Sequence, residues 1–437
     1  MTLQKEHPAS QRLKARQSTL SPHMVRVGER IWQAVNWDES NVAMIVGDDG
    51  LILVDAGMRP SVTEEIRASF RNISPLPIRA IIYTHGHGDH TGGSPSFVTD
   101  GEDVQVWARS NFGAEAALFE AAGLLPQFAA RGGRQSGAGL PAERRSGTGL
   151  SSLSSQMSSG ITFNGKIGSV PPTHFLGEES RELTLCGVRM ELRAAPSETA
   201  DALCVWLPDD GALFVGDALY RSFPNVYPVR GMPCRDVPTW IATLDMLRGY
   251  NAEALLVGHT DPWLGRDAVR QALTNYHDAL EHVFRETVAG MNRGLGPDEL
   301  VRTVKLPEHL ASLDELGEYY GNVAWTVRAL YAAYWGWFDG NPRLLLTEFG
   351  PSEEAARMLE LAGGEEELFR RAESALQNGD TGWALRLVDH LLALQPEHSG
   401  YRRFKADALD AMSDEMLTTT GRNYARTVAM ELRKGGE

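Results

Sequence analysis

Short apolar runs separated by turn residues dominate the first part of the chain. Residues 31–35, 42–46 and 51–54 read IWQAV, VAMIV and LILV, and the polar segments DESN and GDDG separate them. Apolar runs of this length between turn signals predict β-strands. Pro60 favours the first turn of a helix, so we expect residues 61–70 to form one.

The same pattern recurs further along the chain. Two successive sets of strands, each followed by helices, predict sheets packed face to face with helices on the outside. We therefore expect an α/β sandwich domain over residues 24–295, preceded by an N-terminal tail at 1–23. The further strands are predicted at 79–83, 104–108, 182–185, 188–193, 203–207, 212–215 and 254–257, and the helices at 111–121, 237–248 and 268–288.

Beyond about residue 296 the pattern becomes helical. An aromatic stripe with the spacing of one helical face favours a core or dimer face over a cofactor site. Gly340, Asn341 and Pro342 are expected to end this helix. The stripe consists of Tyr331, Tyr334, Trp335 and Phe338.

Residues 365–398 resemble one tetratricopeptide-type helical hairpin, with its turn at Gly379 and Asp380 and its end at Pro396. A lone hairpin cannot bury its own apolar face, so it must pack on neighbouring helices or on another subunit. We expect an all-α domain over residues 296–437.

Glycine, serine and arginine dominate residues 132–160. Such a composition is typical of a flexible surface insertion. The alternative is a lid over the active site whose arginines face an anion.

Charge and composition narrow the possible partners. The net charge of −15 argues against nucleic acid or an anionic membrane, but it is compatible with a small anionic substrate that a local site binds. The three cysteines lack metal-site spacing and predict no disulfide framework. The first residues lack the apolar core of a signal peptide, and no apolar run is long enough to span a bilayer. We therefore expect a cytoplasmic protein without membrane insertion.

The segment THGHGDHTGG at residues 84–93 places His85, His87, Asp89 and His90 directly after a predicted strand. Imidazole and carboxylate groups suit zinc or a similar divalent ion. A catalytic metal site with an open position has about three protein ligands, so four candidate ligands this close together favour two metals. The alternative is a solvated polar turn that holds three of the twelve histidines.

Further candidate ligands lie in the same kind of position. Asp217 and His259 each follow an apolar strand, and Glu198 lies in a turn between two strands. Asp55 also follows a strand, at residues 51–54, and we expect it to hold the histidine segment in place.

Together these residues resemble the metallo-β-lactamase superfamily, an αββα sandwich with a two-zinc site. Most members have histidine at the position of Glu198, whereas the alkylsulfatase branch, the type III sulfatases, has glutamate. The segment NVYPVRG at 225–231 is similar to the sulfate-binding segment of that branch. The segments YGNV and GWFDGNP, between residues 320 and 342, resemble the start of its dimerisation domain. The likeness covers residues 24 to about 430.

The resemblance implies a homodimer formed through the helical domain, and contacts from Asn225 and Arg230 to a sulfate. A planar guanidinium suits a tetrahedral anion, although Arg230 pairing with a nearby carboxylate such as Asp236 is an alternative. Asp217, Asp89 and Arg230 are the expected catalytic residues. The implied zinc ligands are His85, His87 and Glu198 for one ion and Asp89, His90 and His259 for the other, with Asp217 bridging.

The leading hypothesis is hydrolysis of a sulfate ester of an alkyl-like alcohol by a metal-bound hydroxide. A two-zinc site lowers the pKa of its water to about 7, and iron or manganese also suit these ligands. Cleavage of the C–O bond and of the S–O bond both remain open.

Three departures from the branch motivate a second hypothesis, a two-metal hydrolase of another ester, thioester or lactone in specialised metabolism. Thr260 stands where the branch has a second histidine, residues 131–141 lack its tyrosine, and the sterol-carrier-like lipid-binding domain of long members is not expected in this chain. Asp217 is a further departure, because the branch has glutamate at that position. A third hypothesis is a scaffold whose metal site only stabilises the fold while the helical repeat binds a partner protein.

Overall fold

The computed structural model describes residues 7–98, 103–152, 168–346 and 349–434. It divides into two compact units. The first comprises residues 1–15, 129–148 and 335–437, and the second comprises residues 16–128 and 149–334. The second unit holds both sheets, and the first unit is helical.

The first sheet has seven strands in the order of the sequence. Its first four strands pair antiparallel, and the pairs from β4 to β7 are parallel. The strands are β1 (His23–Val27), β2 (Ile31–Val35), β3 (Val42–Val46), β4 (Leu51–Val54), β5 (Ile78–Ile82), β6 (Gln105–Arg109) and β7 (His174–Leu176).

The second sheet has six strands in the order β13-β12-β11-β10-β9-β8. Only β11 and β12 pair parallel, because the helix α7 (Val237–Arg248) connects them. The strands are β8 (Arg181–Leu185), β9 (Val188–Ala194), β10 (Leu203–Leu207), β11 (Ala212–Phe214), β12 (Ala254–Leu256) and β13 (Trp263–Leu264).

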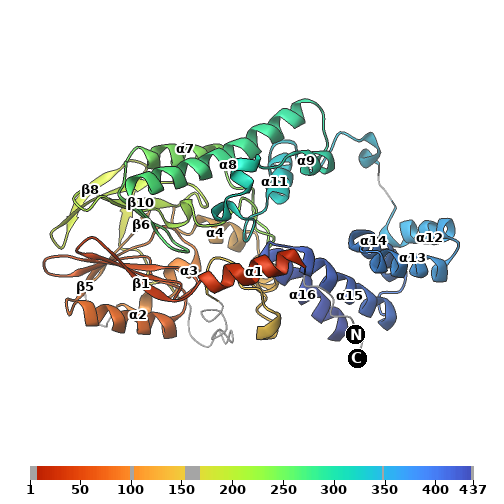
Figure 1. Cartoon of the computed structure of the whole chain (residues 1–437), viewed down its shortest axis with the longest axis horizontal. Helices are drawn as coiled ribbons and strands as arrows, with labels where there is room; N and C mark the ends of the chain where they lie inside the picture. Colours follow the sequence, from red (N-terminus) through yellow and green to blue (C-terminus); the bar gives the residue numbers. More distant parts are fainter. Residues whose placement is uncertain (1–6, 99–102, 153–167, 347–348, 435–437) are drawn as a thin grey trace. The chain divides into compact units, whose positions relative to one another are not determined.

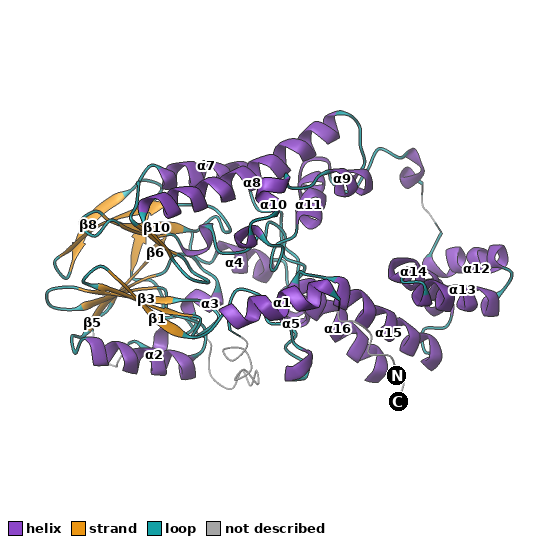
Figure 2. Ribbon diagram, in the orientation of Figure 1, coloured by secondary structure: helices purple, strands orange, loops and turns teal. Residues whose placement is uncertain are grey.

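The second unit is a four-layer sandwich (Figures 1 and 2). Side chains of both sheets, such as Ile52 and Leu192, form the central apolar layer. Ile66 and Phe70 of α2 (Pro60–Ile73) pack on the outer face of the first sheet. Helices α7 and α8 (Arg266–Asn292) cover the outer face of the second sheet. This confirms the predicted α/β sandwich.

The remaining helices occur in both units. Helices α12 to α14 share an apolar core around Leu368 and Leu387, and α15 packs on α16. These helices are α1 (Pro8–Thr19), α3 (Gly88–Thr91), α4 (Ala114–Ala121), α5 (Leu125–Ser136), α9 (Pro297–Thr303), α10 (Glu308–Ala311), α11 (Val323–Trp335), α12 (Pro351–Ala362), α13 (Glu365–Gln377), α14 (Thr381–Leu394), α15 (Ser399–Glu415) and α16 (Thr419–Lys434).

Most predicted strands and helices are present with the predicted bounds to within a few residues. Strands β1, β7 and β13 were not predicted, and neither was α1, which lies in the expected N-terminal tail. Helices α13 and α14 form the predicted hairpin, and the Asp380 side chain accepts a hydrogen bond from the Trp383 backbone at the start of α14. Its likeness to a tetratricopeptide repeat stays a prediction.

The predicted aromatic stripe is wrong only at its last member, Phe338. Helix α11 ends at Trp335, because Gly336 adopts a left-handed conformation with φ 73°. Phe338 therefore lies beyond the helix. Tyr331 is buried, whereas Tyr334 is 55% exposed.

The glycine- and serine-rich segment is only partly as expected. Helix α5 occupies its beginning, and residues 153–160 lie outside the described part of the chain. Arg134 pairs with Glu431 at 2.9 Å, and Arg144 pairs with Asp410. These two arginines therefore pair with carboxylates of α16 and α15, which argues against their facing a substrate anion.

Among the helices of the described ranges, none is both long and apolar enough to cross a membrane.

Candidate metal centre

Four strands end at the same edge of the sandwich with a polar side chain just beyond the strand. Asp55 follows β4, and His85 follows β5, its parallel neighbour; Asp217 and His259 follow β11 and β12 in the same way. The carboxyl ends of parallel strands meet at one sheet edge, so these side chains converge. Glu198 reaches the site from the connection between β9 and β10.

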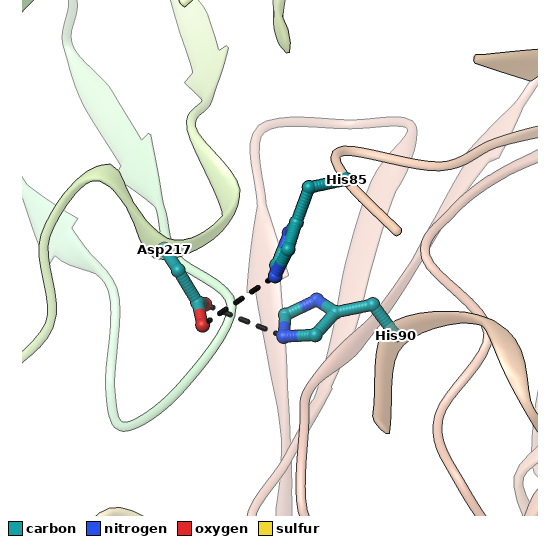
Figure 3. A group of neighbouring side chains, drawn as sticks. All are labelled: His85, His90 and Asp217. Atoms are coloured by element: carbon teal, nitrogen blue, oxygen red, sulfur yellow. Dashed lines mark ion pairs between the residues drawn. The ribbon is translucent and has the colours of Figure 1, made fainter. Parts of the chain in front are cut away.

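Asp217 faces the imidazoles of both His85 and His90 (Figure 3). Its Oδ1 is 3.4 Å from His90 Nε2, and its Oδ2 is 3.8 Å from His85 Nε2 and 3.3 Å from His259 Nε2. Asp89 Oδ2 lies 3.5 Å from His90 Nε2 and 3.4 Å from His259 Nε2. Three imidazole nitrogens and two carboxylates thus face one another in a largely buried space.

The structure brings all seven predicted metal ligands together. They form three groups in which the candidate ligand atoms lie within 4.8 Å of one another. Asp217 belongs to two of these groups, as a bridging ligand would. The groups are His85, His90 and Asp217; Asp89, His90 and His259; and His87, Glu198 and Asp217.

Hydrogen bonds at Nδ1 determine where these histidines carry their protons. His90 Nδ1 lies 2.8 Å from Asp55 Oδ2, and His259 Nδ1 lies 2.8 Å from the Glu39 carbonyl oxygen. His85 Nδ1 contacts the Thr84 hydroxyl, which already donates its proton to Asp55. Each Nδ1 therefore faces an acceptor and carries the proton, so each neutral ring presents a bare Nε2 to the cluster.

The protein does not supply a hydrogen-bond donor to these bare nitrogens within the described residues. His85 Nε2 and Asp217 Oδ1 are buried and make no hydrogen bond with the described residues. His90 Nε2 and His259 Nε2 face each other at 3.4 Å, although neither carries a proton in the neutral form. Lone pairs and carboxylate oxygens that converge in this way fit a divalent cation. The alternative, a solvated polar turn without metal chemistry, does not explain them.

Electrostatics agree with an anionic ligand set. Burial alone would raise the pKa of Asp217, but its electrostatic attraction to His259 and His90 and its hydrogen bonds with them outweigh burial and hold that pKa well below the usual value. Burial would likewise raise the pKa of Asp89, but interactions with His90 and His259 lower it. Both carboxyl groups are therefore anionic and suited to bind a cation.

Two glycines allow this close approach. A Cβ atom on Gly258 would lie 2.3 Å from Asp217 Oδ1 and 2.6 Å from His90 Cε1. Gly216 has φ 52°, and a Cβ there would lie 2.5 Å from Thr84 Oγ1. A larger residue at Gly258 would displace Asp217 and His90, and one at Gly216 would displace Thr84, whose hydroxyl contacts Asp55 and His85.

The turn before β3 donates hydrogen bonds to the backbone of two loops that carry candidate ligands, those of Asp89 and His259. Ser40 Oγ donates to the Asp89 carbonyl at 2.6 Å. The Asn41 side-chain amide donates to the carbonyls of Val257, at 3.0 Å, and Thr260, at 2.7 Å. Thr260 has φ 66°, which is strained for a β-branched residue, so Asn41 holds the backbone beside His259 in a conformation it would not adopt alone.

An arginine that the sequence analysis missed lies beside Glu198. Arg235 pairs with Glu198 at 2.6 Å and donates through Nη1 to the Asn225 carbonyl. Tyr220 donates to Glu198 at 3.0 Å and accepts from the Asn225 backbone N–H at 2.9 Å. Glu198, Arg235, Tyr220 and Asn225 thus form one buried network.

This network leaves donors open. Arg235 Nε, Arg235 Nη2 and Asn225 Nδ2 are buried and have no hydrogen-bond partner among the described residues, although both side chains are almost fully enclosed. Open donors of this kind are expensive unless an anion satisfies them. The sequence offered one signal for this anion site: Arg235 follows Arg230 by five positions.

Arg230 has a different neighbour from the one expected. Its Nη2 pairs at 3.0 Å with Glu115 Oε1, and Glu115 Oε2 lies 3.3 Å from His87 Nε2. The alternative prediction that Arg230 pairs with a carboxylate is therefore confirmed, but the partner is Glu115. The Asp236 side chain caps α7 by accepting from the Thr239 backbone. Glu115, on the first turn of α4, gave no signal in the sequence.

The fold and this ligand set define a class of protein. Residues 35–259 match the family model of the metallo-beta-lactamase superfamily, and residues 296–435 match that of alkyl sulfatase dimerisation. The chain therefore belongs to the metallo-β-lactamase superfamily, within its alkylsulfatase branch.

Individual relatives agree with this placement. A linear primary-alkylsulfatase of a Pseudomonas species is 34% identical, over 89% of this chain and 73% of the relative. The alkyl/aryl-sulfatase BDS1 of Saccharomyces cerevisiae is 27% identical, over 94% of this chain and 64% of that protein. The solved structure of the stereoselective inverting sec-alkylsulfatase Pisa1 from Pseudomonas has a TM-score of 0.87 at 27% identity, over 99% of this chain and 69% of that one. The chain thus spans about two thirds of the length of these relatives.

Proposed function

We propose that this enzyme is a metal-dependent hydrolase that cleaves the sulfate ester of an alkyl-like alcohol. The observation that carries the proposal is the set of open, buried donors on Arg235 and Asn225 beside the candidate ligand Glu198. A buried guanidinium with unused N–H groups is a binding site for a tetrahedral anion. The names of the relatives, which are alkylsulfatases, support a sulfate group as this anion.

The candidate ligands fit two divalent cations, for which we propose zinc; iron and manganese accept the same donor types. When bound, the cations would supply an acidified water as nucleophile and positive charge against the anionic substrate. We propose that His85, His87 and Glu198 hold one cation, that Asp89, His90 and His259 hold the other, and that Asp217 bridges them.

The chain's own residues hold the sulfate. Asn225 Nδ2 and the open edge of Arg235 would donate to its oxygens, which stabilises negative charge as the ester bond breaks. The ion pair with Glu198 fixes Arg235 relative to the ligand set, so the anion is bound at a defined distance from the nucleophile. Arg230 adds positive charge at the edge of this site.

We also propose a division of labour between the domains. Residues 24–295 would carry catalysis, and residues 296–437 would join two copies into a homodimer. The match of residues 296–435 to the alkyl sulfatase dimerisation family supports this.

Kinetics with matched substrates test the proposal. Arg235→Lys keeps a positive charge next to Glu198 but removes the planar fork, so we expect KM for decyl sulfate to rise about tenfold. KM for any unsulfated decyl ester that the enzyme turns over should change little. Arg266→Lys, at an exposed ion pair with Glu253, is the matched control. An equal effect of Arg235→Lys on sulfated and unsulfated substrates would favour the hydrolase of another ester.

A further inference from the structure

Glu115 connects the metal centre with the anion site. Its two oxygens contact different partners, His87 Nε2 at 3.3 Å and Arg230 Nη2 at 3.0 Å. The side chain is 19% exposed, so little water screens it. Helix α4 holds it from its first turn, and the Asp201 side chain fixes the start of this helix by accepting from the Gly113 backbone at 2.9 Å.

Glu115 is a permanent negative charge. Its carboxylate pairs with the Arg230 guanidinium at 3.0 Å, and a carboxylate in such a pair stays ionised at neutral pH. The carboxylate therefore adds negative charge beside the candidate metal ligand His87. It also cancels part of the positive charge that Arg230 offers to a bound anion.

We propose that Glu115 is a specificity-determining residue that makes the site select monoanionic esters over dianionic ones. This inference rests on the proposed function, in which Arg235 and Asn225 hold the anion. A sulfate monoester carries one negative charge, which Arg235 can neutralise while Arg230 stays paired with Glu115. A phosphate monoester carries two at neutral pH, and its second charge would face the Glu115 carboxylate, which repels it.

The same repulsion would favour product release. Hydrolysis adds water across the ester bond and yields the alcohol and hydrogensulfate, which loses its proton at neutral pH. The monoanionic substrate thus becomes the dianionic sulfate, the charge state that Glu115 disfavours. Glu115 therefore acts against product inhibition as well as against phosphate esters.

Binding of matched inhibitors to the metal-replete enzyme tests this inference. Decyl phosphate is a dianion at pH 8, and decyl methyl phosphate is a monoanion with the same chain. We expect Glu115→Gln to lower the dissociation constant of decyl phosphate about tenfold relative to that of decyl methyl phosphate. The reason is that the substitution removes one negative charge close to the bound anion. The dissociation constant of inorganic sulfate should fall as well. Glu115→Asp, which keeps the charge, should leave the ratio of the two dissociation constants near that of the wild type.

Glu120→Gln is the control, since Glu120 lies exposed on the same helix. Metal content is measured in every sample, and zinc is restored where His87 has lost it. An unchanged ratio in fully loaded Glu115→Gln, or an equal change in Glu120→Gln, would overturn the inference. These are binding measurements, so they stand whether or not decyl sulfate proves to be a substrate, and failure of the proposed function is seen separately as absent sulfate release.

Discussion

Asp55 Oδ2 accepts the Nδ1 proton of His90 at 2.8 Å, and both side chains are almost completely buried. The other Asp55 oxygen accepts from the Thr84 backbone N–H at 2.8 Å. One carboxylate thus orients a candidate ligand and anchors the start of the histidine segment, as the sequence predicted for Asp55.

Asp55→Asn should therefore weaken metal binding without unfolding the protein. Asp55 has φ 59°, a conformation that asparagine tolerates, so the backbone can stay in place. Loss of an orienting partner of this kind lowers metal affinity by roughly 10- to 100-fold. Competition with a chromogenic chelator measures this affinity. Asp209→Asn, at an exposed pair with Arg189, is the control and should leave it unchanged.

Asn41→Ala should lower the free energy of unfolding by about 2–3 kcal/mol, because it leaves the buried Thr260 carbonyl without its donor and the Asn36 backbone N–H without its acceptor. The Val257 carbonyl loses one of two donors and keeps the Gln33 side chain. Metal affinity should fall with it, since these carbonyls flank His259. Urea unfolding of the metal-loaded protein gives the first quantity. Asn292→Ala, at an exposed helix end, is the comparison; equal stability losses in the two variants would rule out this role for Asn41.

The stability of the sandwich should fall at high pH through Tyr83. Burial raises the pKa of this phenol to about 12, and its hydroxyl donates to the Val170 carbonyl at 3.0 Å. The unfolded chain ionises near pH 10, before the folded state does, so the stabilising contribution is complete below pH 10 and is lost between pH 10 and 12. From pH 9 to pH 11 the loss should be about 1 kcal/mol. Tyr83→Phe should remove that part of the pH dependence, and an unchanged slope in this variant would contradict the assignment.

The sandwich and the metal ligands could be predicted because their signals are local. A short apolar run ending in aspartate or histidine identifies both a strand and the side chain at its edge, as at Asp217 and His259. Helix α11 was predicted too long because Gly336 could not be distinguished from a glycine within a helix.

The anion site could be predicted only in part, because it depends on contacts between distant segments. The ion pair between Arg235 and Glu198 joins residues whose approach only the folded sheets determine. Glu115 is one of several acidic residues on predicted helices, and nothing in its neighbourhood indicates that it reaches His87 and Arg230. The support that Asn41 gives to Thr260 is likewise a tertiary contact.

Release of inorganic sulfate from decyl sulfate, measured by ion chromatography together with the metal content of the same sample, tests the central claim most directly. We expect about two zinc ions per chain and one sulfate released for each decyl sulfate consumed. Chelation and Asp217→Ala should abolish release, and zinc should restore the chelated wild type but not the variant. Chelator-sensitive hydrolysis of esters or lactones with no release of sulfate would contradict the account.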